Sequence, residues 1–291
     1  MSEDPVVSVI VRTVDRSALL AEALVSLAGQ TERRLEAVVV DMGAVASPVV
    51  DRFRDRLARI RHVRPGRVLS RPLALNEGVR HAAAGTVAIL DDDNVFDPPH
   101  LAVLVAGLER TAADLVYTGV RRATYTPGGE LIESIDRDHP FEMERLLEGN
   151  FIHTAGTAFR KRIWAEIGGY DVRFPVGEDY DFLLRVAASG RIASLPGVTA
   201  ESRSYTGRPG IQTHALEVAT VRRSTAGLYW RHPALRRSAW RRATVNAASG
   251  TGAARWQRGV RAVADLAGWW WYCARPASRR RSPGRDVLLL P

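Results

Sequence analysis

Four consecutive polar residues, Asp91-Asp92-Asp93-Asn94, are the part of this sequence best suited to chemistry. They follow residues 86–90, an apolar run with the pattern of a buried strand. Three adjacent carboxylates raise one another's pKa unless a cation is present. A hard divalent cation such as Mg²⁺ or Mn²⁺ takes oxygen ligands and commonly combines carboxylates with substrate phosphates. Placement at a strand end favours a metal–phosphate site over a solvated turn in which Asp93 caps the next helix.

A second acidic cluster, Glu178-Asp179-Tyr180-Asp181, opens an amphipathic pattern that predicts a helix over residues 178–189. Carboxylates complement the helix dipole at this end of a helix, so the cluster taken alone favours a structural role. The alternative is a carboxylate general base that takes a proton from a hydroxyl group.

Strand and helix patterns alternate in the first 120 residues and must position these acids. The expected strands cover residues 6–11, 36–41, 60–63, 86–90 and 114–120, and the expected helices residues 18–28, 48–57, 72–84 and 98–110. This alternation predicts an α/β fold with a mostly parallel sheet and helices on both faces. Thr13, Asp15 and Asp41 follow the first two strands, so we expect them at the same sheet edge as the acidic run.

The pattern changes after residue 120. Residues 126–129, Thr-Pro-Gly-Gly, predict a hairpin turn between strands over residues 121–125 and 130–135. Further patterns predict a strand over residues 154–160, a helix over residues 161–167 and a loop over residues 207–210. From residue 212 onwards the sequence is rich in Ala and Arg and has a helical pattern.

Common nucleotide loops and hydrolase motifs are absent from the sequence. There is no Gly-x-x-x-x-Gly-Lys-Ser/Thr loop, no Gly-x-Gly-x-x-Gly after the first strand, no pair of His residues at zinc-ligand spacing and no Gly-x-Ser-x-Gly elbow. A bound nucleotide would therefore be held by neither a Walker loop nor a dinucleotide fingerprint.

An ordered series of segments over residues 6–195 resembles a family 2 glycosyltransferase of the GT-A fold. Residues 7–16 resemble the opening strand and its loop, Gln30-Thr31 the dipeptide after the first helix, and residues 35–43 the strand that ends in Asp-Asp-Gly-Ser. Four further segments match Arg-x-x-Ala-x-Asn-x-Gly, the Asp-x-Asp metal motif, Gly-Gly-Phe-Asp and Glu-Asp-x-Asp-Leu-x-Leu-Arg, at residues 71–78, 90–94, 168–171 and 178–185.

The resemblance implies an inverting transfer of a sugar from a nucleotide-diphosphate sugar to an acceptor hydroxyl. Asp91 and Asp93 would anchor Mg²⁺ or Mn²⁺ on the donor diphosphate, and the ion would neutralise the leaving nucleotide. Asp179 would deprotonate the acceptor hydroxyl.

The resemblance also implies which residues contact the donor. Thr13, Asp15 and Asp41 would line the nucleoside pocket, Asp92 would contact the ribose or the sugar, and Arg71 would help to neutralise the diphosphate. A UDP-type sugar is the expected donor, with dTDP and GDP sugars as alternatives. Residues 1–205 would form the catalytic domain, with the nucleotide-sugar half over residues 1–120 and the acceptor half over residues 121–205.

Three positions depart from the family pattern. Met42 replaces the second acid of the Asp-Asp pair and cannot accept a hydrogen bond from a base N–H as a carboxylate would. Arg12 and Val14 stand where the family usually has Pro and Tyr. The identity of the base is therefore open.

Other polar residues are candidates for the acceptor pocket or a lid. Glu178 and His153 could reach the acceptor, although a hydrogen-bonded structural role is the alternative for His153. Arg203, Arg208 and His214 flank the predicted 207–210 loop, where a lid could carry a diphosphate or metal contact.

The excess of positive over negative charge lies in the last third of the 291 residues. Residues 201–291 hold 17 basic and 4 acidic side chains, whereas residues 1–200 hold 24 basic and 28 acidic ones. Residues 206–291 are expected to form a basic helical extension, and its Trp269-Trp270-Trp271 run suits either a peripheral contact with an anionic membrane or a protein contact such as a homo-oligomer. Without a visible signal peptide or spanning segment, we expect a cytoplasmic protein, with any membrane contact at the inner face.

Three alternative functions compete with a metal-dependent transferase. Another nucleotide transferase on the same type of sheet is disfavoured, because such enzymes usually begin with a Gly-rich loop. A nucleic-acid-binding protein could use the basic tail, but it would leave both acidic clusters unexplained. A nucleotide-sugar-binding adaptor without activity is consistent with the altered residue at Met42.

Overall fold

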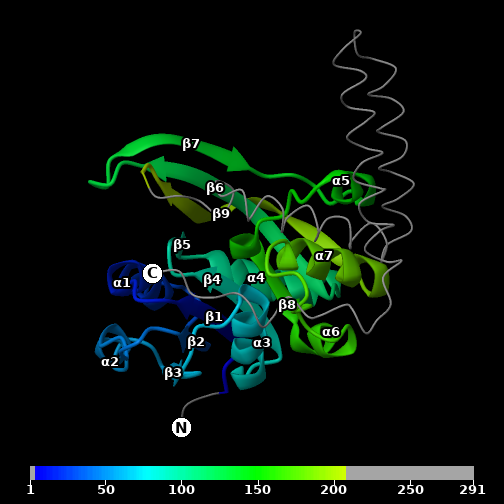
Figure 1. Ribbon diagram of the computed structural model, residues 1–291. Helices are drawn as coiled ribbons and strands as arrows, with labels where there is room; N and C mark the ends of the chain where they lie inside the picture. Colours follow the sequence, from blue (N-terminus) through cyan, green and yellow to red (C-terminus); the bar gives the residue numbers. More distant parts are fainter. Residues whose placement is uncertain (1–3, 208–291) are drawn as a thin grey trace, which may run out of the picture. The chain divides into compact units, whose positions relative to one another are not determined.

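The computed structural model describes residues 4–207, which form one nine-stranded sheet with helices packed against it (Figure 1). The strands lie in the order β3-β2-β1-β4-β8-β6-β9-β5, and β7 pairs with β6. This parallel-rich α/β architecture confirms the fold class that the strand–helix alternation predicts. The expected C-terminal extension lies almost entirely outside the described residues, so the domain boundaries stay predictions.

The first four long strands are parallel, and two of them end at the acids Asp41 and Asp91. They are β1 (Val7–Thr13), β2 (Leu35–Asp41), β3 (Arg59–Val63) and β4 (Thr86–Asp91), with α1 (Ser17–Ala28), α2 (Val49–Arg52) and α3 (Arg71–His81) in the connections. In the register of this sheet, Thr13 lies beside Asp41 and Arg12 beside Asp91. The strand ends are therefore aligned at one edge.

The second half of the sheet is mixed. Its strands are β5 (Asn94–Phe96), β6 (Leu115–Tyr125), β7 (Leu131–Arg137), β8 (Thr157–Arg160) and β9 (Ile192–Tyr205). Its helices are α4 (His100–Thr111), α5 (Met143–Glu148), the short η1 (Thr154–Gly156), α6 (Lys161–Glu166) and α7 (Glu178–Ser189). Strand β8 is antiparallel to both β4 and β6, whereas β6 and β9 are parallel. Every helix within residues 4–207 is too short or too polar to cross a membrane.

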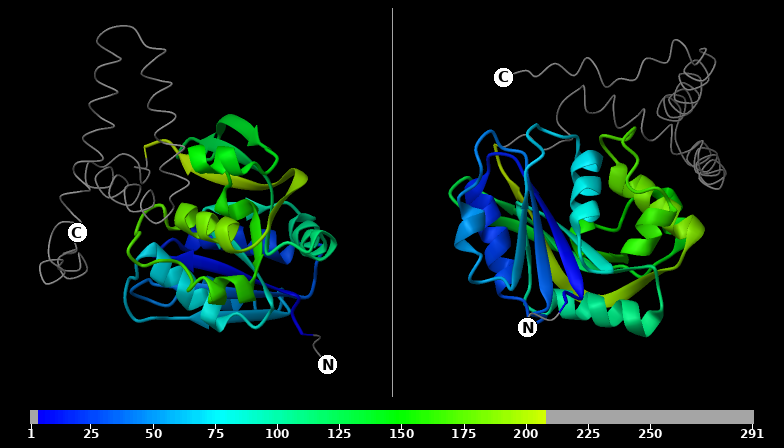
Figure 2. Two further views of the ribbon diagram at one scale, coloured as in Figure 1. Left: turned by 90° about the vertical axis from the view of Figure 1, so that its right-hand side faces the viewer. Right: turned by 90° about the horizontal axis from the view of Figure 1, so that it is seen from below.

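Helices cover both faces of the parallel strands, which explains why apolar side chains predominate in β1, β2 and β4 (Figure 2). On one face, Val7, Val9 and Val11 of β1 join a buried cluster with side chains of α1 and α4. On the other face α3 packs very closely, because a Cβ atom added at Gly78 would lie 2.2 Å from Ile10 Cγ2. The backbone of α3 thus lies almost directly on β1.

Several predicted boundaries were wrong, and two strands were not predicted. The helix expected over residues 48–57 is only the four residues of α2, and α3 ends at His81 because Ala82 takes an extended conformation. Residues 114–120 and 121–125 lie largely in one continuous strand, β6. Neither β5 nor β9 was expected, because β5 is short and β9 contains Pro196 and Gly197, which are typical of turns.

Candidate active site at the carboxyl edge of the sheet

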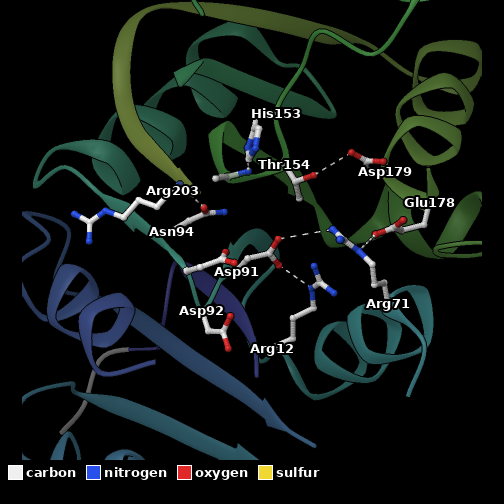
Figure 3. A network of polar contacts seen from close by, with 12 residues as sticks. Arg12, Arg71, Asp91, Asp92, Asn94, His153, Thr154, Glu178, Asp179 and Arg203 are labelled. Carbon is white, nitrogen blue, oxygen red and sulfur yellow. Dashed lines mark hydrogen bonds and ion pairs between the residues drawn. The ribbon is translucent and has the colours of Figure 1, made fainter. Parts of the chain in front are cut away.

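Carboxylates from both halves of the chain meet at one edge of the sheet (Figure 3). The acidic run leaves β4 at Asp91 and enters β5 at Asn94, so Asp92 and Asp93 form a turn between two strands. The first turn of α7, with Glu178 and Asp179, lies next to this turn. Ligands of α/β proteins bind at this edge of the sheet.

Exposure divides the acidic run into one buried and two accessible side chains. The side chain of Asp92 is fully buried, whereas those of Asp91 and Asp93 are 20% and 31% exposed. Asp91 and Asp93 are therefore the two acids of the run that a ligand could reach.

Two arginines hold the carboxylate of Asp91. Arg12 Nε donates to Oδ1 at 2.7 Å, and Arg71 Nη2 lies 3.8 Å from Oδ2. Burial alone would raise the pKa of Asp91, but the charges of Arg12 and Arg71 outweigh this effect and hold the pKa well below its usual range. A fixed carboxylate and two guanidinium groups thus meet at the end of β4.

Asp92 ties the turn to the end of β1. Thr13 Oγ1 donates to Asp92 Oδ2 at 2.7 Å, and Arg16 Nη2 lies 2.6 Å from Oδ1. Burial raises the pKa of Asp92 to about 6, although Thr13 and Arg16 act in the opposite direction. Burial and the charge of Asp91 also raise the pKa of Asp93, which pairs with Arg16 Nη1 at 3.2 Å.

Asp41 orders the loop that follows β2. Its Oδ1 accepts from the Gly43 amide at 3.0 Å, and its Oδ2 accepts from the Ser47 amide at 2.8 Å and lies 2.9 Å from His62 Nε2. Burial alone would raise the pKa of Asp41, but these hydrogen bonds outweigh it and lower the pKa. The adjacent Met42 is buried and accepts from the Leu69 amide through Sδ at 3.3 Å. The nucleoside contact of Asp41 stays a prediction.

The loops after β1 and β2 touch each other at Asp15 and Gly43. Asp15 adopts a left-handed φ of 49° and accepts from the Ala44 amide through Oδ1 at 3.2 Å. A Cβ atom at Gly43 would lie 2.4 Å from Asp15 Oδ1, so a larger residue would push the two loops apart. Asp15 therefore borders the same edge as Asp41.

Arg71 bridges the two acidic clusters. Its Nε donates to Glu178 Oε1 at 2.7 Å, while its Nη2 faces Asp91 (Figure 3). The side chain of Glu178 is 3% exposed, and burial raises its pKa against the opposing charge of Arg71. The start of α3 and the start of α7 are thus joined at the site.

Asp179 is oriented by neutral donors from outside its helix. Asn150 Nδ2 donates to Asp179 Oδ2 at 3.0 Å, and Thr154 Oγ1 lies 3.5 Å from the same oxygen. Asp179 is partly exposed, so a bound ligand could reach its carboxylate, and its role as a general base stays a prediction. Asp181, by contrast, is fully buried and pairs with Arg185 at 2.6 Å within α7, which is a structural role.

His153 caps the short helix η1 at the same edge. Its Nδ1 accepts from the Ala155 amide at 3.2 Å. Burial lowers the pKa of His153, although the negative charges of Asp91 and Asp179 act in the opposite direction. His153 therefore lies within electrostatic range of both acidic clusters, and a role towards an acceptor stays a prediction.

The guanidinium of Arg203 points away from the acidic turn (Figure 3). It pairs with Glu22 at 2.7 Å and with Glu201 at 2.6 Å, and it stacks over the ring of Tyr125. Only its backbone amide reaches the turn, where it donates to Asn94 Oδ1 at 3.1 Å. The other lid candidates, Arg208 and His214, lie outside the described residues.

The accessible acids suit a metal ion that is shared with a ligand. Within residues 4–207, no three His, Cys, Asp or Glu side chains converge so that they could hold a metal ion by themselves. Asp91 and Asp93 nevertheless offer carboxylate oxygens, the donors that Mg²⁺ and Mn²⁺ prefer. Phosphate oxygens of a bound ligand would complete such a site.

Some site residues escaped the sequence-based predictions. In the sequence Arg12 is only a departure from the family pattern, and its contact with Asp91 follows from the pairing of β1 with β4. Asn150 and Thr154 carry no sequence signal of their own. A polar residue close to a strand end was the one indication available for Arg16.

The model of the family described as glycosyltransferase-like family 2 matches residues 5–242. The chain belongs to glycosyltransferase family 2. A PGL/p-HBAD biosynthesis glycosyltransferase of this kind from Mycobacterium tuberculosis (strain ATCC 25177 / H37Ra) is 31% identical over 192 residues, which are 62% of this chain and 69% of the relative.

Solved structures support the GT-A fold of this family 2 glycosyltransferase. Residues 1–349 of S. aureus TarS in complex with UDP-GlcNAc match with a TM-score of 0.59 and 16% identity, over 76% of this chain and 66% of that one. This chain spans 42% of a longer TarS chain. The mannosyltransferase PcManGT from Pyrobaculum calidifontis, in complex with GDP-Man and Mn²⁺, matches with a TM-score of 0.53 and 21% identity, over 93% of this chain and 84% of that one.

Proposed function

We propose that this family 2 glycosyltransferase is an inverting enzyme that moves a sugar from a nucleotide-diphosphate sugar to an acceptor hydroxyl. The observation that carries the proposal is the bridge from Asp91 through Arg71 to Glu178, the neighbour of Asp179. This bridge puts the acids suited to a donor diphosphate and the acid suited to a proton transfer at one edge of the sheet.

The donor would lie along the carboxyl ends of β1, β2 and β4. Thr13, Asp15 and Asp41 would border the nucleoside, and Arg71 would face the diphosphate. A UDP-type sugar is the proposed donor, with dTDP and GDP sugars as alternatives. Support comes from the similar folds of TarS, which binds UDP-GlcNAc, and PcManGT, which binds GDP-Man. The buried Met42 offers no carboxylate to a base, so the base must be read by other groups.

Asp91 and Asp93 would hold Mg²⁺ or Mn²⁺ together with the donor phosphates. When bound, the ion would neutralise charge that develops on the departing nucleoside diphosphate. The exposure of these two acids and the Mn²⁺ in the PcManGT complex support this assignment.

Asp179 would act as the general base. Its carboxylate would take the proton of the acceptor hydroxyl while the hydroxyl oxygen attacks the anomeric carbon. The new carbon–oxygen bond would form on the face opposite the diphosphate, and the electron pair of the broken bond would leave with the nucleoside diphosphate. Asn150 and Thr154 would keep the carboxylate directed at the acceptor.

The stereochemistry of transfer tests this mechanism. The full chain would be incubated with Mn²⁺ and a panel of α-linked UDP, dTDP and GDP sugars, with water as the acceptor, and the released sugar would be followed by ¹H NMR before mutarotation. We expect the β anomer to appear first. The α anomer as the first product would overturn the inverting mechanism.

A further inference from the structure

Strand β7 is an exposed edge of the sheet. All seven of its residues are exposed, and within residues 4–207 it pairs with β6 on one side and with no strand on the other (Figure 1). Three large apolar side chains on it, Leu131, Ile132 and Ile135, are 56%, 53% and 51% exposed. Apolar side chains beside a row of unpaired backbone groups are a template for pairing with another strand.

The charges of β7 restrict which strand can pair with it. Glu133, Ile135 and Arg137 lie on one face of the strand, where they pair with Thr124, Arg122 and Val120 of β6. Within the described residues Arg137 makes no ion pair, and Glu133 accepts only a long hydrogen bond of 3.5 Å from Thr124. A partner strand that offers an acid to Arg137 and a base to Glu133 would fit this face, and β7 itself has that sequence.

Comparison of the central registers selects one self-pairing. Two identical antiparallel strands are related by a two-fold axis, and the residue at the axis faces its own copy. An axis at Glu133 or Asp136 would place like charges opposite each other, which destabilises a strand pair. An axis at Ser134 would place Glu133 opposite Ile135. An axis at Ile135 places this side chain against its copy and Glu133 opposite Arg137 on both sides.

We propose that β7 is a dimer interface, in which it pairs antiparallel with β7 of a second copy about a two-fold axis at Ile135. The interface would extend the sheet through two molecules and cover the exposed apolar side chain of Ile135. Charged residues commonly protect edge strands from random pairing, and here their order leaves one self-complementary register.

Cross-linking at the axis tests the register. The full chain would carry Cys273→Ser, which removes its single cysteine, and then Ile135→Cys. We expect a short bismaleimide to join two copies at Ile135→Cys far more efficiently than at the matched variant Ile132→Cys. Ile132 is equally exposed but lies on the other face, opposite Asp138 of the copy. Equal yields at the two positions would overturn the proposed register.

Charge reversal tests the partner. By sedimentation, we expect the full chain to dimerise at micromolar concentrations, Glu133→Arg or Arg137→Glu alone to weaken the dimer at least tenfold, and the double reversal to restore it. These side chains are exposed, so circular dichroism should show an unchanged fold. A monomeric full chain, as would follow if another segment or another protein covered β7, would overturn the proposal. A dimer that is insensitive to both single reversals would also overturn it.

Discussion

Arg71 Nε donates to Glu178 Oε1 at 2.7 Å, across a sequence separation of 107 residues. Arg71 begins α3 in the half that carries the acidic turn, and Glu178 begins α7 in the half that carries Asp179. The same guanidinium faces Asp91. One side chain therefore contacts both acidic clusters.

Removal of this bridge should destabilise the fold. In Arg71→Met the buried Glu178 carboxylate loses its partner, and we expect the free energy of unfolding to fall by about 1–3 kcal/mol, since Arg71 is partly exposed. Glu178→Gln in the same background should restore part of the loss, which gives a coupling energy of about 0.5–2 kcal/mol in a double-mutant cycle. Additive effects in urea unfolding would show that the bridge is not energetically coupled.

Asp179→Asn should remove the proposed base while leaving donor binding intact. We expect the rate of nucleoside diphosphate release from a donor to fall by about 10²–10⁴-fold, because the amide cannot accept the acceptor proton. The KM for the donor should change little. Turnover would be measured by release of the nucleoside diphosphate.

The matched control for this variant is Asp51→Asn, the same change at an exposed carboxylate of α2 that pairs with Arg54 at 2.9 Å. It should retain the activity of the unmodified chain. If Asp179→Asn keeps full turnover, Asp179 is not the base, and if it loses donor binding as well, its role is structural.

Buried His100 should make the fold sensitive to acid. Burial lowers the pKa of His100 from 6.5 to about 3, and its Nδ1 lies 2.6 Å from Thr199 Oγ1. Below about pH 6.5 the unfolded chain binds a proton at His100, whereas the folded chain keeps His100 neutral. The contribution of neutral His100 to the free energy of unfolding is therefore complete above pH 6.5 and is lost as the pH falls towards 3. Between pH 7 and 4.5 the unmodified chain should lose about 2 kcal/mol more than His100→Gln. The free energy of unfolding would be measured with urea at each pH. The same pH dependence in the unmodified chain and in His100→Gln would contradict this expectation.

Because α3 packs closely on β1, alanine substitutions at Gly78 and Gly85 should have different effects on stability. Gly78→Ala should cost about 1–3 kcal/mol, because its Cβ would meet Ile10 Cγ2 at 2.2 Å in a packed core. Gly85→Ala meets no atom within 4 Å and should be neutral or stabilise by up to about 1 kcal/mol. Thermal unfolding of both variants checks this, and equal melting temperatures would contradict the packing.

The sequence was sufficient to predict the parallel half of the sheet and the acids at its edge. The strands β1, β2 and β4 are buried on both faces, so they are mostly apolar and end at polar residues. The position of Asp91–Asn94 at a strand end followed directly from this pattern. The family and the fold were then recognisable from the order of short motifs.

Long-range partners could not be read from the sequence. The contact of Arg12 with Asp91 requires β1 to lie next to β4, and that of Asn150 with Asp179 requires the loop before η1 to reach α7. The longest strand, β9, contains Pro196-Gly197, and its pairing with β6 shifts register near Gly119. Such features depend on the complete topology rather than on a local pattern.

Binding of nucleoside diphosphates to the full chain is the most direct test of a donor site at Asp91–Asp93. Melting temperatures would be measured with UDP, GDP, dTDP and CDP, each with Mn²⁺, with Mg²⁺ or with EDTA. At about 100-fold excess over Kd, a specific ligand adds about 2.7 kcal/mol, or roughly 5–10 °C. We expect such a rise for at least one diphosphate with metal, and loss of its metal-dependent part in EDTA and in Asp93→Asn. A donor site at Asp91–Asp93 would be contradicted if no diphosphate raised the melting temperature. It would also be contradicted if neither EDTA nor Asp93→Asn reduced the rise seen for the unmodified chain with metal.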